Sequence, residues 1–290
     1  MSPRAGIALL LVISVVFGAN HVAARLAIDH GASVAGAVAV RSACTALFLL
    51  ALLKGNVGID REILPRALLT GCLVAVQSYC LYSAVAIIPV GLALLVFQTF
   101  PLLYVLLSWA TGKERPHAST LLPIPVALLG LALALNALEM NAASATPAAQ
   151  MGRGVAWAFG AALAFTVVVY LNAHWLKALD GRVRTFYMMG VTAVLVLAGG
   201  GVAGTLALPQ DATGWVALAL LTVFYGTAIT SLFLILPRLH GAAGTIALNF
   251  EPIAALGIAW VVLGQAIRPL QVLGAFIVVG AIAWLTLAKR

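Results

Sequence analysis

The chain has 290 residues, of which 63% are hydrophobic and 8% are charged, and it carries a formal net charge of +8. Soluble globular domains carry about 25% charged residues, so this composition excludes a soluble fold and makes lipid the expected solvent. Most basic side chains lie between the apolar runs or near their ends, which indicates orientation in a membrane and argues against a nucleic-acid partner.

Ten continuous apolar runs follow one another and leave almost no residues for a soluble domain. A helix of about 20 residues crosses the hydrocarbon core of a bilayer. The runs are uniformly apolar and lack the alternation of barrel strands. We therefore predict an all-α membrane protein with ten transmembrane helices. The runs are Ile7–Leu26, Ser33–Leu53, Ala67–Ile88, Val90–Thr111, Leu121–Leu138, Val155–Leu176, Val183–Leu206, Trp215–Leu236, Gly241–Leu263 and Leu270–Leu287.

The basic residues divide unequally when the connections are assigned alternately to the two sides of the membrane. With the first residue inside, twelve of the sixteen lysines and arginines lie on the inner side. Only Arg25, Arg153 and Arg268 lie on the outer side, and Arg41 lies within the second run. Because positive loops stay cytoplasmic, both termini are expected to face the cytoplasm.

Polar residues first interrupt the apolar pattern in the first two runs. Asn20 and His21 stand together in the phrase FGANHVAARLA, and Arg41 stands well inside the second run. Polar and charged side chains at such depth usually face the bundle interior. Asn20 either joins helices by hydrogen bonding or lines a cavity, and both interpretations stay open. For His21, no neighbouring carboxylate is apparent in the sequence.

Further candidates for a cavity lie in the third, sixth and eighth runs. The third run reads VAVQSYCLYSAVA and contains Gln77, Tyr79 and Tyr82. The two tyrosines are three residues apart and so share one helix face. A tyrosine offers an apolar ring and a hydroxyl, which suits a cavity for mixed ligands, although tyrosines also anchor helices at the membrane interface. Tyr170 and Tyr225 lie deep in the sixth and eighth runs and are interpreted in the same way.

An internal repeat relates the fourth and ninth runs. When residues 93–109 are placed on 244–260 without a gap, an amide, a proline and a tryptophan coincide. The chain is therefore predicted to consist of two five-helix halves, residues 1–148 and 149–290. Because five is odd, the halves start on opposite sides, which is the inverted-repeat architecture of many secondary transporters. The matched pairs are Gln98 with Asn249, Pro101 with Pro252, and Trp109 with Trp260.

The two matched prolines predict breaks near the middle of the membrane. Pro101 cannot donate to the carbonyl of Phe97, and Pro252 cannot donate to that of Leu248. Such breaks are tolerated in a bilayer where they face protein or a wet cavity. Prolines also bend membrane helices without further consequence, but matched interruptions in two halves point to a transport site with the prolines as gates.

Glu251 and Arg41 are the two formal charges well inside predicted spans. Counted from the span ends, they lie about 15 Å and about 12 Å deep at 1.5 Å per residue. These depths are compatible with an ion pair that either locks two helices or binds a zwitterion. A further interpretation is that Glu251 takes up a proton.

The sequence contains no motif for nucleotide, metal or covalent chemistry. No GxxxxGK[ST], HExxH or GxSxG pattern occurs at a membrane site, and Cys44, Cys72 and Cys80 lack metal-ligand spacing. We therefore expect no enzyme activity, no cofactor and no metal.

The chain as a whole resembles the drug/metabolite transporter superfamily and its EamA-type exporters. The likeness rests on FGAN in the first run, Arg41 in the second, the paired proline helices, and the phrases GKERP (112–116) and GQAIRP (264–269). Within that family the chain looks most like the aromatic amino-acid exporters. The resemblance implies a cavity open to one side at a time, in a bacterial inner membrane.

These observations favour an inner-membrane exporter of amino acids, aromatic and other neutral ones, or of similar small metabolites. Efflux of cationic drugs is the alternative, and a membrane-embedded enzyme or scaffold ranks below both. Asn20, Gln98 and Asn249 are expected to bind the polar head of the ligand. The coupling ion, which includes the proton, and the oligomeric state stay open.

Overall fold

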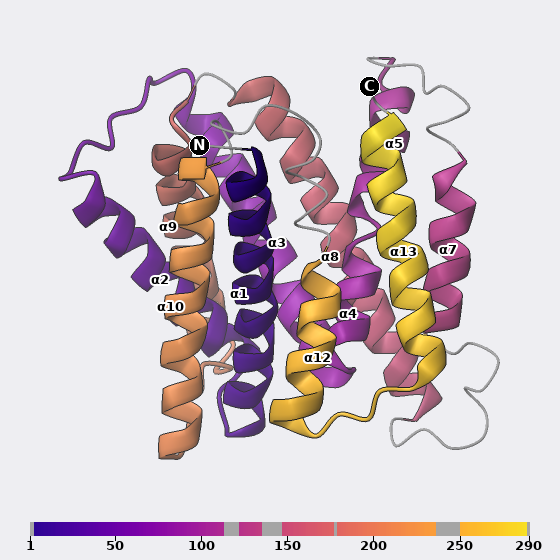
Figure 1. The fold of residues 1–290 in the computed structure, drawn as a ribbon. Helices are drawn as coiled ribbons and strands as arrows, with labels where there is room; N and C mark the ends of the chain where they lie inside the picture. Colours follow the sequence, from indigo (N-terminus) through magenta and orange to yellow (C-terminus); the bar gives the residue numbers. More distant parts are fainter. Residues whose placement is uncertain (1–2, 113–121, 135–146, 177–178, 236–249, 289–290) are drawn as a thin grey trace.

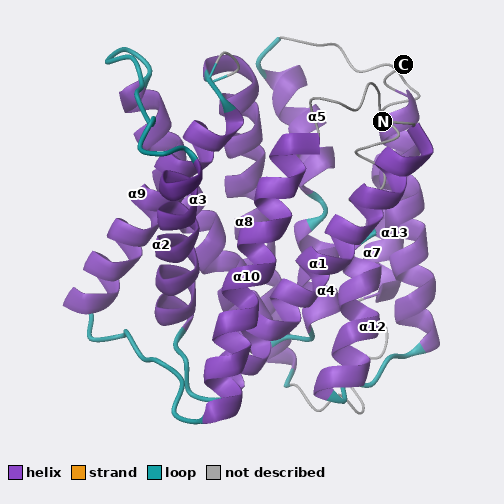
Figure 2. Ribbon diagram, turned by 60° about the vertical axis from the view of Figure 1, so that its left-hand side comes forward, coloured by secondary structure: helices purple, strands orange, loops and turns teal. Residues whose placement is uncertain are grey.

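The computed structural model describes residues 3–112, 122–134, 147–176, 179–235 and 250–288, and all regular structure in this part of the chain is helical. The helices pack into one bundle whose connections lie at its two ends (Figures 1 and 2). They are α1 (Pro3–Asp29), α2 (Val34–Leu52), α3 (Leu64–Ile87), α4 (Val90–Phe97), α5 (Phe100–Ala110), α7 (Pro123–Ala134), α8 (Ala148–Trp175), α9 (Gly181–Val202), α10 (Ala212–Ile235), α12 (Glu251–Leu263) and α13 (Pro269–Ala288).

Seven described stretches are long and apolar enough to cross a membrane. They correspond to the expected spans one to four and six to eight, with α4 and α5 together forming the fourth. The fifth and ninth expected spans lie partly outside the described residues, where α7 and α12 cover the rest, and α13 corresponds to the tenth. The count of ten complete spans therefore stays a prediction.

Both ends of the chain lie at the same end of the bundle (Figure 1). At the opposite end, the turn between α1 and α2 pairs with the connection between α9 and α10. There Ser33 donates its amide to the carbonyl of Ala207 at 3.0 Å, and His30 Nδ1 lies 2.6 Å from Asp211 Oδ2. The amide of Gly214 and then His30 hold the pKa of the Asp211 carboxyl below its ordinary value.

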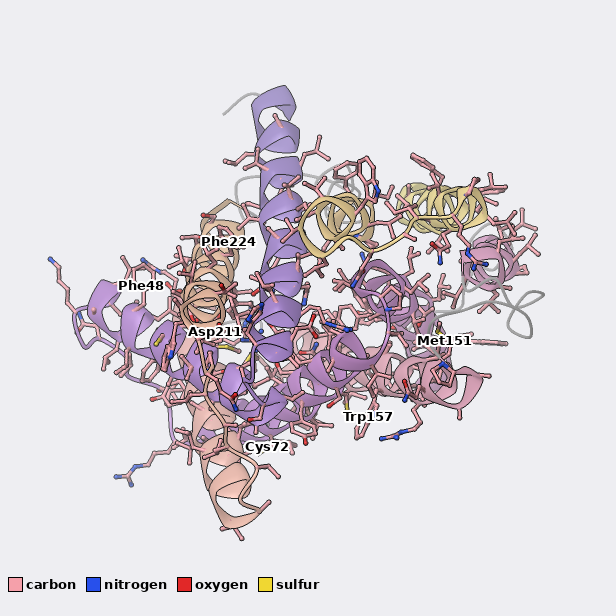
Figure 3. All side chains as sticks on the ribbon, turned by 90° about the horizontal axis from the view of Figure 1, so that it is seen from below. Phe48, Cys72, Met151, Trp157, Asp211 and Phe224 are labelled. Carbon is pink, nitrogen blue, oxygen red and sulfur yellow. The ribbon has the colours of Figure 1, made fainter. Side chains whose placement is uncertain are left out.

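The closest helix pairs join elements from the two halves of the chain. α3 packs along α8, and α1 packs along α10, while α2 meets α9 and α7 meets α13. Large apolar side chains cover the outside: Phe48 and Trp157 lie at the periphery when the bundle is viewed along its helices (Figure 3). The interior combines large apolar residues with small and polar ones, and many further large apolar side chains are exposed on the outside, as expected where lipid is the solvent.

The break predicted in the fourth span is present. α4 ends at Phe97 and α5 begins at Phe100, with Pro101 in its first turn, where a missing amide hydrogen costs least. Two carbonyls beside the break accept from hydroxyl groups: Thr99 donates to the carbonyl of Val96 at 2.8 Å, and Thr166 of α8 donates to that of Phe100 at 3.3 Å. The break is thus a separation into two half-helices rather than a bend in one helix.

The second matched proline also lies at the start of a helix. α12 begins at Glu251 and has Pro252 in its first turn. The negative side chain of Glu251 therefore lies at the positive end of the helix dipole, which favours it. The preceding part of the ninth predicted span lies outside the described residues.

Glycine allows α1 and α12 to touch. A Cβ atom added at Gly18 would lie 2.9 Å from the backbone nitrogen of Ala255 and 3.2 Å from the carbonyl oxygen of Glu251. Backbone cannot move aside as a flexible side chain can, so only glycine permits this approach. The contact sets how close the Glu251 end of α12 lies to α1.

We predict that Gly18→Ala destabilises the protein by about 1–3 kcal/mol, because overpacking forces the two helices apart. Thermal unfolding of the detergent-solubilised protein measures this change. Gly257→Ala is the matched control, since an added Cβ at Gly257 of α12 meets no atom within 4 Å. Equal unfolding temperatures for the two variants would contradict the close contact.

Candidate functional site

Polar side chains from five helices meet inside the bundle. We call this group the polar cluster; α1, α2, α3, α10 and α12 contribute to it. Its helices are held in place by the pairing of α1 with α10 and with α12, and of α2 with α10. The members are Asn20, His21, Arg41, Gln77, Ser78, Tyr82, Tyr225 and Glu251.

Arg41 is the cation at the middle of the polar cluster, and only 3% of it is exposed. Its guanidinium donates from Nη1 to the hydroxyl of Tyr82 at 3.1 Å and from Nη2 to that of Ser78 at 3.0 Å. It also lies over the ring of Tyr225, 3.8 Å from the centroid, and 5.0 Å from that of Tyr82. The buried Nε has no partner in the described part of the chain.

Tyr82 connects α1 to α2. Its hydroxyl accepts from Arg41 and lies 3.4 Å from the amide nitrogen of Asn20, and both Tyr82 and Asn20 are fully buried. Gln77 is also buried, with its amide oxygen 3.4 Å from the Ser78 hydroxyl. Tyr82 and, through it, Asn20 are therefore brought to the Arg41 guanidinium, with Gln77 beside its second acceptor, Ser78.

In the structure the partner of Glu251 is His21 and not Arg41. His21 Nε2 lies 3.1 Å from Glu251 Oε1, with side-chain exposures of 7% and 17%. Within the described residues no carboxylate pairs with Arg41, so the direct Arg41–Glu251 pair is wrong. His21 does have an acid beside it, which the sequence alone did not make apparent. The neighbouring α1 residues therefore have different partners: Asn20 contacts Tyr82, and His21 contacts Glu251.

Two of the expected tyrosines lie away from the polar cluster. Tyr79 is 39% exposed, and its ring packs edge-on against Trp157 at 6.2 Å, toward the outside of α3 and α8. Tyr170 donates to the Thr111 hydroxyl at 3.1 Å and stacks with His174 at 4.3 Å. The interval of three residues between Tyr79 and Tyr82 therefore does not place both in the same surroundings.

The remaining expected residues belong to the two breaks. Gln98 is buried between α4 and α5, and Pro252 is buried in the first turn of α12. Asn249 lies outside the described residues. No described contact joins Gln98 to the polar cluster.

Sequence reasoning missed Ser78 and Phe17. Ser78 lies one helical turn before Tyr82, so it shares the face that contacts Arg41, and this spacing was the available signal. The ring of Phe17 meets that of Tyr225 edge-on at 6.3 Å, and it is the ring of Tyr225 that lies over the guanidinium.

A groove of about 290 Å³ lies between α2 and α10. Its threonines donate to carbonyls of their own helices, as Thr45 does to Arg41 and Thr227 does to Val223, so the groove surface is mainly apolar. The lining residues are Cys44, Thr45, Phe48, Thr222, Val223, Gly226 and Thr227. Across the described ranges, no group of three or more His, Cys, Asp or Glu residues is arranged to hold a metal ion.

Together, the fold and the buried polar cluster define a multi-pass helical membrane protein with a charged interior. The family model of the EamA-like transporter family matches the chain twice, over residues 4–136 and 152–287. The chain therefore belongs to the EamA-like transporter family, within the drug/metabolite transporter superfamily, and is a membrane transporter of small molecules. A solved crystal structure, whose title names no function, has a similar fold: the TM-score is 0.66 at 18% identity over 98% of this chain and 99% of the other.

We predict a coupling energy of about 0.5–3 kcal/mol between His21 and Glu251 in a double-mutant cycle with His21→Ala and Glu251→Gln. Each single change leaves the other side chain of the pair buried without its partner, whereas the double change removes both the imidazole and the carboxylate. Unfolding of the purified protein in detergent measures the cycle. The comparison cycle combines Arg41→Gln with Glu251→Gln and is expected to give the smaller coupling. A larger value for that second cycle would contradict the pairing described above.

Proposed function

We propose that the protein exports amino acids, aromatic and other neutral ones, or similar small metabolites across a bacterial inner membrane by alternating access. The observation that carries this proposal is the polar cluster, in which a buried cation, hydroxyls, amides and aromatic rings meet within an apolar bundle. A ligand with a polar head and an apolar side chain matches both kinds of surface. The residues proposed to bind it are Asn20, His21, Arg41, Gln77, Tyr82, Tyr225 and Glu251, with Tyr170, Gln98 and Asn249 belonging to other parts of its path. Tyr79, which was expected among them, packs against Trp157 toward the outside and is left out of the proposed site.

The helix pairings support the proposal that the halves, 1–148 and 149–290, are inverted repeats. Helices that hold the same position in the two halves can be matched by chain order: α1 corresponds to α8, and α3 corresponds to α10. The close pair α3–α8 then becomes α10–α1, which is also close, and α2–α9 and α7–α13 map onto themselves. α1 and α8 run in opposite directions in the bundle (Figure 1). A two-fold relation of this kind lets one arrangement open to either side.

The two half-helix starts are proposed as gates. Pro101 and Pro252 each lie in the first turn of a helix that begins within the bundle, and α4 packs against α12. A helix that is already interrupted can tilt at its break without losing further hydrogen bonds. Tilting of α5 and α12 would change access to the polar cluster from opposite sides of the membrane.

Charge distribution supports a topology with both termini in the cytoplasm. Lys54 and Arg61 lie in the connection between α2 and α3, and Arg182 lies in the first turn of α9, at the end of the bundle that holds both termini. We expect green fluorescent protein fused to the C-terminus to fluoresce and alkaline phosphatase fused there to be inactive. Phosphatase inserted at Gly204 should be active and at Gly55 inactive. The reverse pattern would overturn the orientation.

We predict that Tyr82→Phe lowers export about 5- to 100-fold, because it leaves Arg41 and Asn20 without a shared hydroxyl at a cost of about 1–3 kcal/mol. Tyr79→Phe on the same helix is the matched control and should stay within about twofold, since Tyr79 faces outward. Efflux of labelled phenylalanine and threonine from preloaded cells measures both variants.

Efflux from cells with the wild-type protein that equals efflux from empty-vector cells would end the amino-acid proposal. Resistance to cationic dyes without amino-acid efflux would support the cationic alternative. Flux in proteoliposomes with and without a proton gradient would then establish whether protons are coupled.

A further inference from the structure

We propose that Arg41 is a receptor for a carboxylate, so that the site recognises the acid group of its ligand and does not require an ammonium group. This inference rests on the proposed export function and names the chemical feature that decides which ligands are taken. Organic monoanions with an aromatic or apolar body, including acids that have no amino group, belong to the predicted ligands.

The first reason is an uncompensated charge. Arg41 is a buried cation, and the intramembrane acid on the described chain, Glu251, is engaged by His21 at 3.1 Å. A buried charge is costly unless it is paired and hydrogen-bonded. Hydroxyls and aromatic faces lower this cost around Arg41, but they carry no negative charge. An incoming anion would supply the missing counter-charge.

The second reason is the number of free donors. A guanidinium has five N–H groups in one plane, arranged to match the two oxygens of a carboxylate. Tyr82 and Ser78 accept one bond each from Nη1 and Nη2, and the buried Nε is unpartnered in the described part of the structure. The guanidinium therefore retains donors for a two-point contact with a carboxylate.

The third reason is the surroundings of the guanidinium. The centroid of the Tyr225 ring lies 3.8 Å from the guanidinium carbon of Arg41, and that of the Tyr82 ring lies 5.0 Å from it. The Tyr225 ring in turn meets the ring of Phe17 at 6.3 Å. The amide of Asn20 and the hydroxyl of Tyr82 can also donate to an anion. An acid with an aromatic or apolar body thus finds its charge bound by Arg41 and its body beside rings.

The ammonium group of an amino acid finds no comparable partner. The acid of the polar cluster, Glu251, already has Oε1 at 3.1 Å from His21 Nε2, so an ammonium group would share this carboxylate with the imidazole. The same competition applies to cationic ligands. The geometry therefore favours acids over amines that carry the same side chain.

Competition by four ligands that share one aromatic body tests this inference. Phenylalanine, phenylpyruvate and 3-phenylpropionate carry the carboxylate, whereas 2-phenylethylamine carries only the ammonium. We expect the three acids to stabilise the purified full-length protein against heat and to inhibit labelled phenylalanine flux in proteoliposomes at similar concentrations. The amine should be about 10- to 100-fold weaker, the value of a lost charged hydrogen bond.

Two variants separate recognition from a structural role. Arg41→Gln should abolish the preference for acids over the amine, and Arg41→Lys should keep part of it, because lysine retains the charge without the planar fork. If Arg41→Gln does not fold, Ser78→Ala serves instead, since it removes one acceptor that holds the guanidinium. It should change the affinity for acids and leave that for the amine unaltered, whereas Tyr79→Phe should change neither.

The outcomes distinguish this inference from the export proposal. Phenylalanine flux that phenylethylamine inhibits as well as phenylpropionate does would overturn the inference and leave export intact. Stabilisation by acids without any flux would support the carboxylate site and end the export proposal. No stabilisation or inhibition by any acid, or an unchanged acid preference in Arg41→Gln, would show that Arg41 only joins helices.

Discussion

Charged side chains within the bundle must find their partners inside the protein, because hydrocarbon offers none. Arg41 and Glu251 meet this constraint in different ways. Glu251 lies at the positive end of α12 and contacts His21, while Arg41 is held by two hydroxyls and two aromatic rings. A charge at mid-bilayer costs about 2.5–3.5 kcal/mol on insertion scales, so such residues are retained where they serve a function. The packing of α1, α2, α3, α10 and α12 follows from the need to surround them.

The interrupted helices meet the same constraint on the backbone. A break inside a membrane is tolerated only where other groups satisfy the freed carbonyls. Between α4 and α5 the hydroxyls of Thr99 and Thr166 donate to the carbonyls of Val96 and Phe100, and the proline falls in a first turn, where no amide hydrogen is needed. The interruption of the fourth span is therefore compatible with a buried position in the bundle.

Some expectations depended on depth and helical periodicity, and these quantities describe only part of a side chain's position. Arg41 and Glu251 were expected at compatible depths, but depth says nothing about which face of each helix meets which neighbour. The direction of α1 relative to α12 brings His21 to Glu251, and the direction of α2 relative to α3 brings Arg41 to Tyr82. Likewise, Tyr79 lies on the same helix as Tyr82, yet the ring of Tyr79 packs against Trp157 of α8 on the outside of the bundle.

The sequence by itself determined the class of the molecule. Continuous apolar runs predict membrane helices, and paired prolines predict the breaks. The repeat of an amide, a proline and a tryptophan predicts two related halves. Each of these features is local in the sequence and does not depend on how the helices pack. Only the tertiary structure decided which polar groups meet. The pairing of Glu251 with His21, and the isolation of Arg41 from any acid in the described chain, depend on how helices far apart in sequence rotate against one another. That rotation is set by contacts such as Gly18 against Ala255, which no single helix contains.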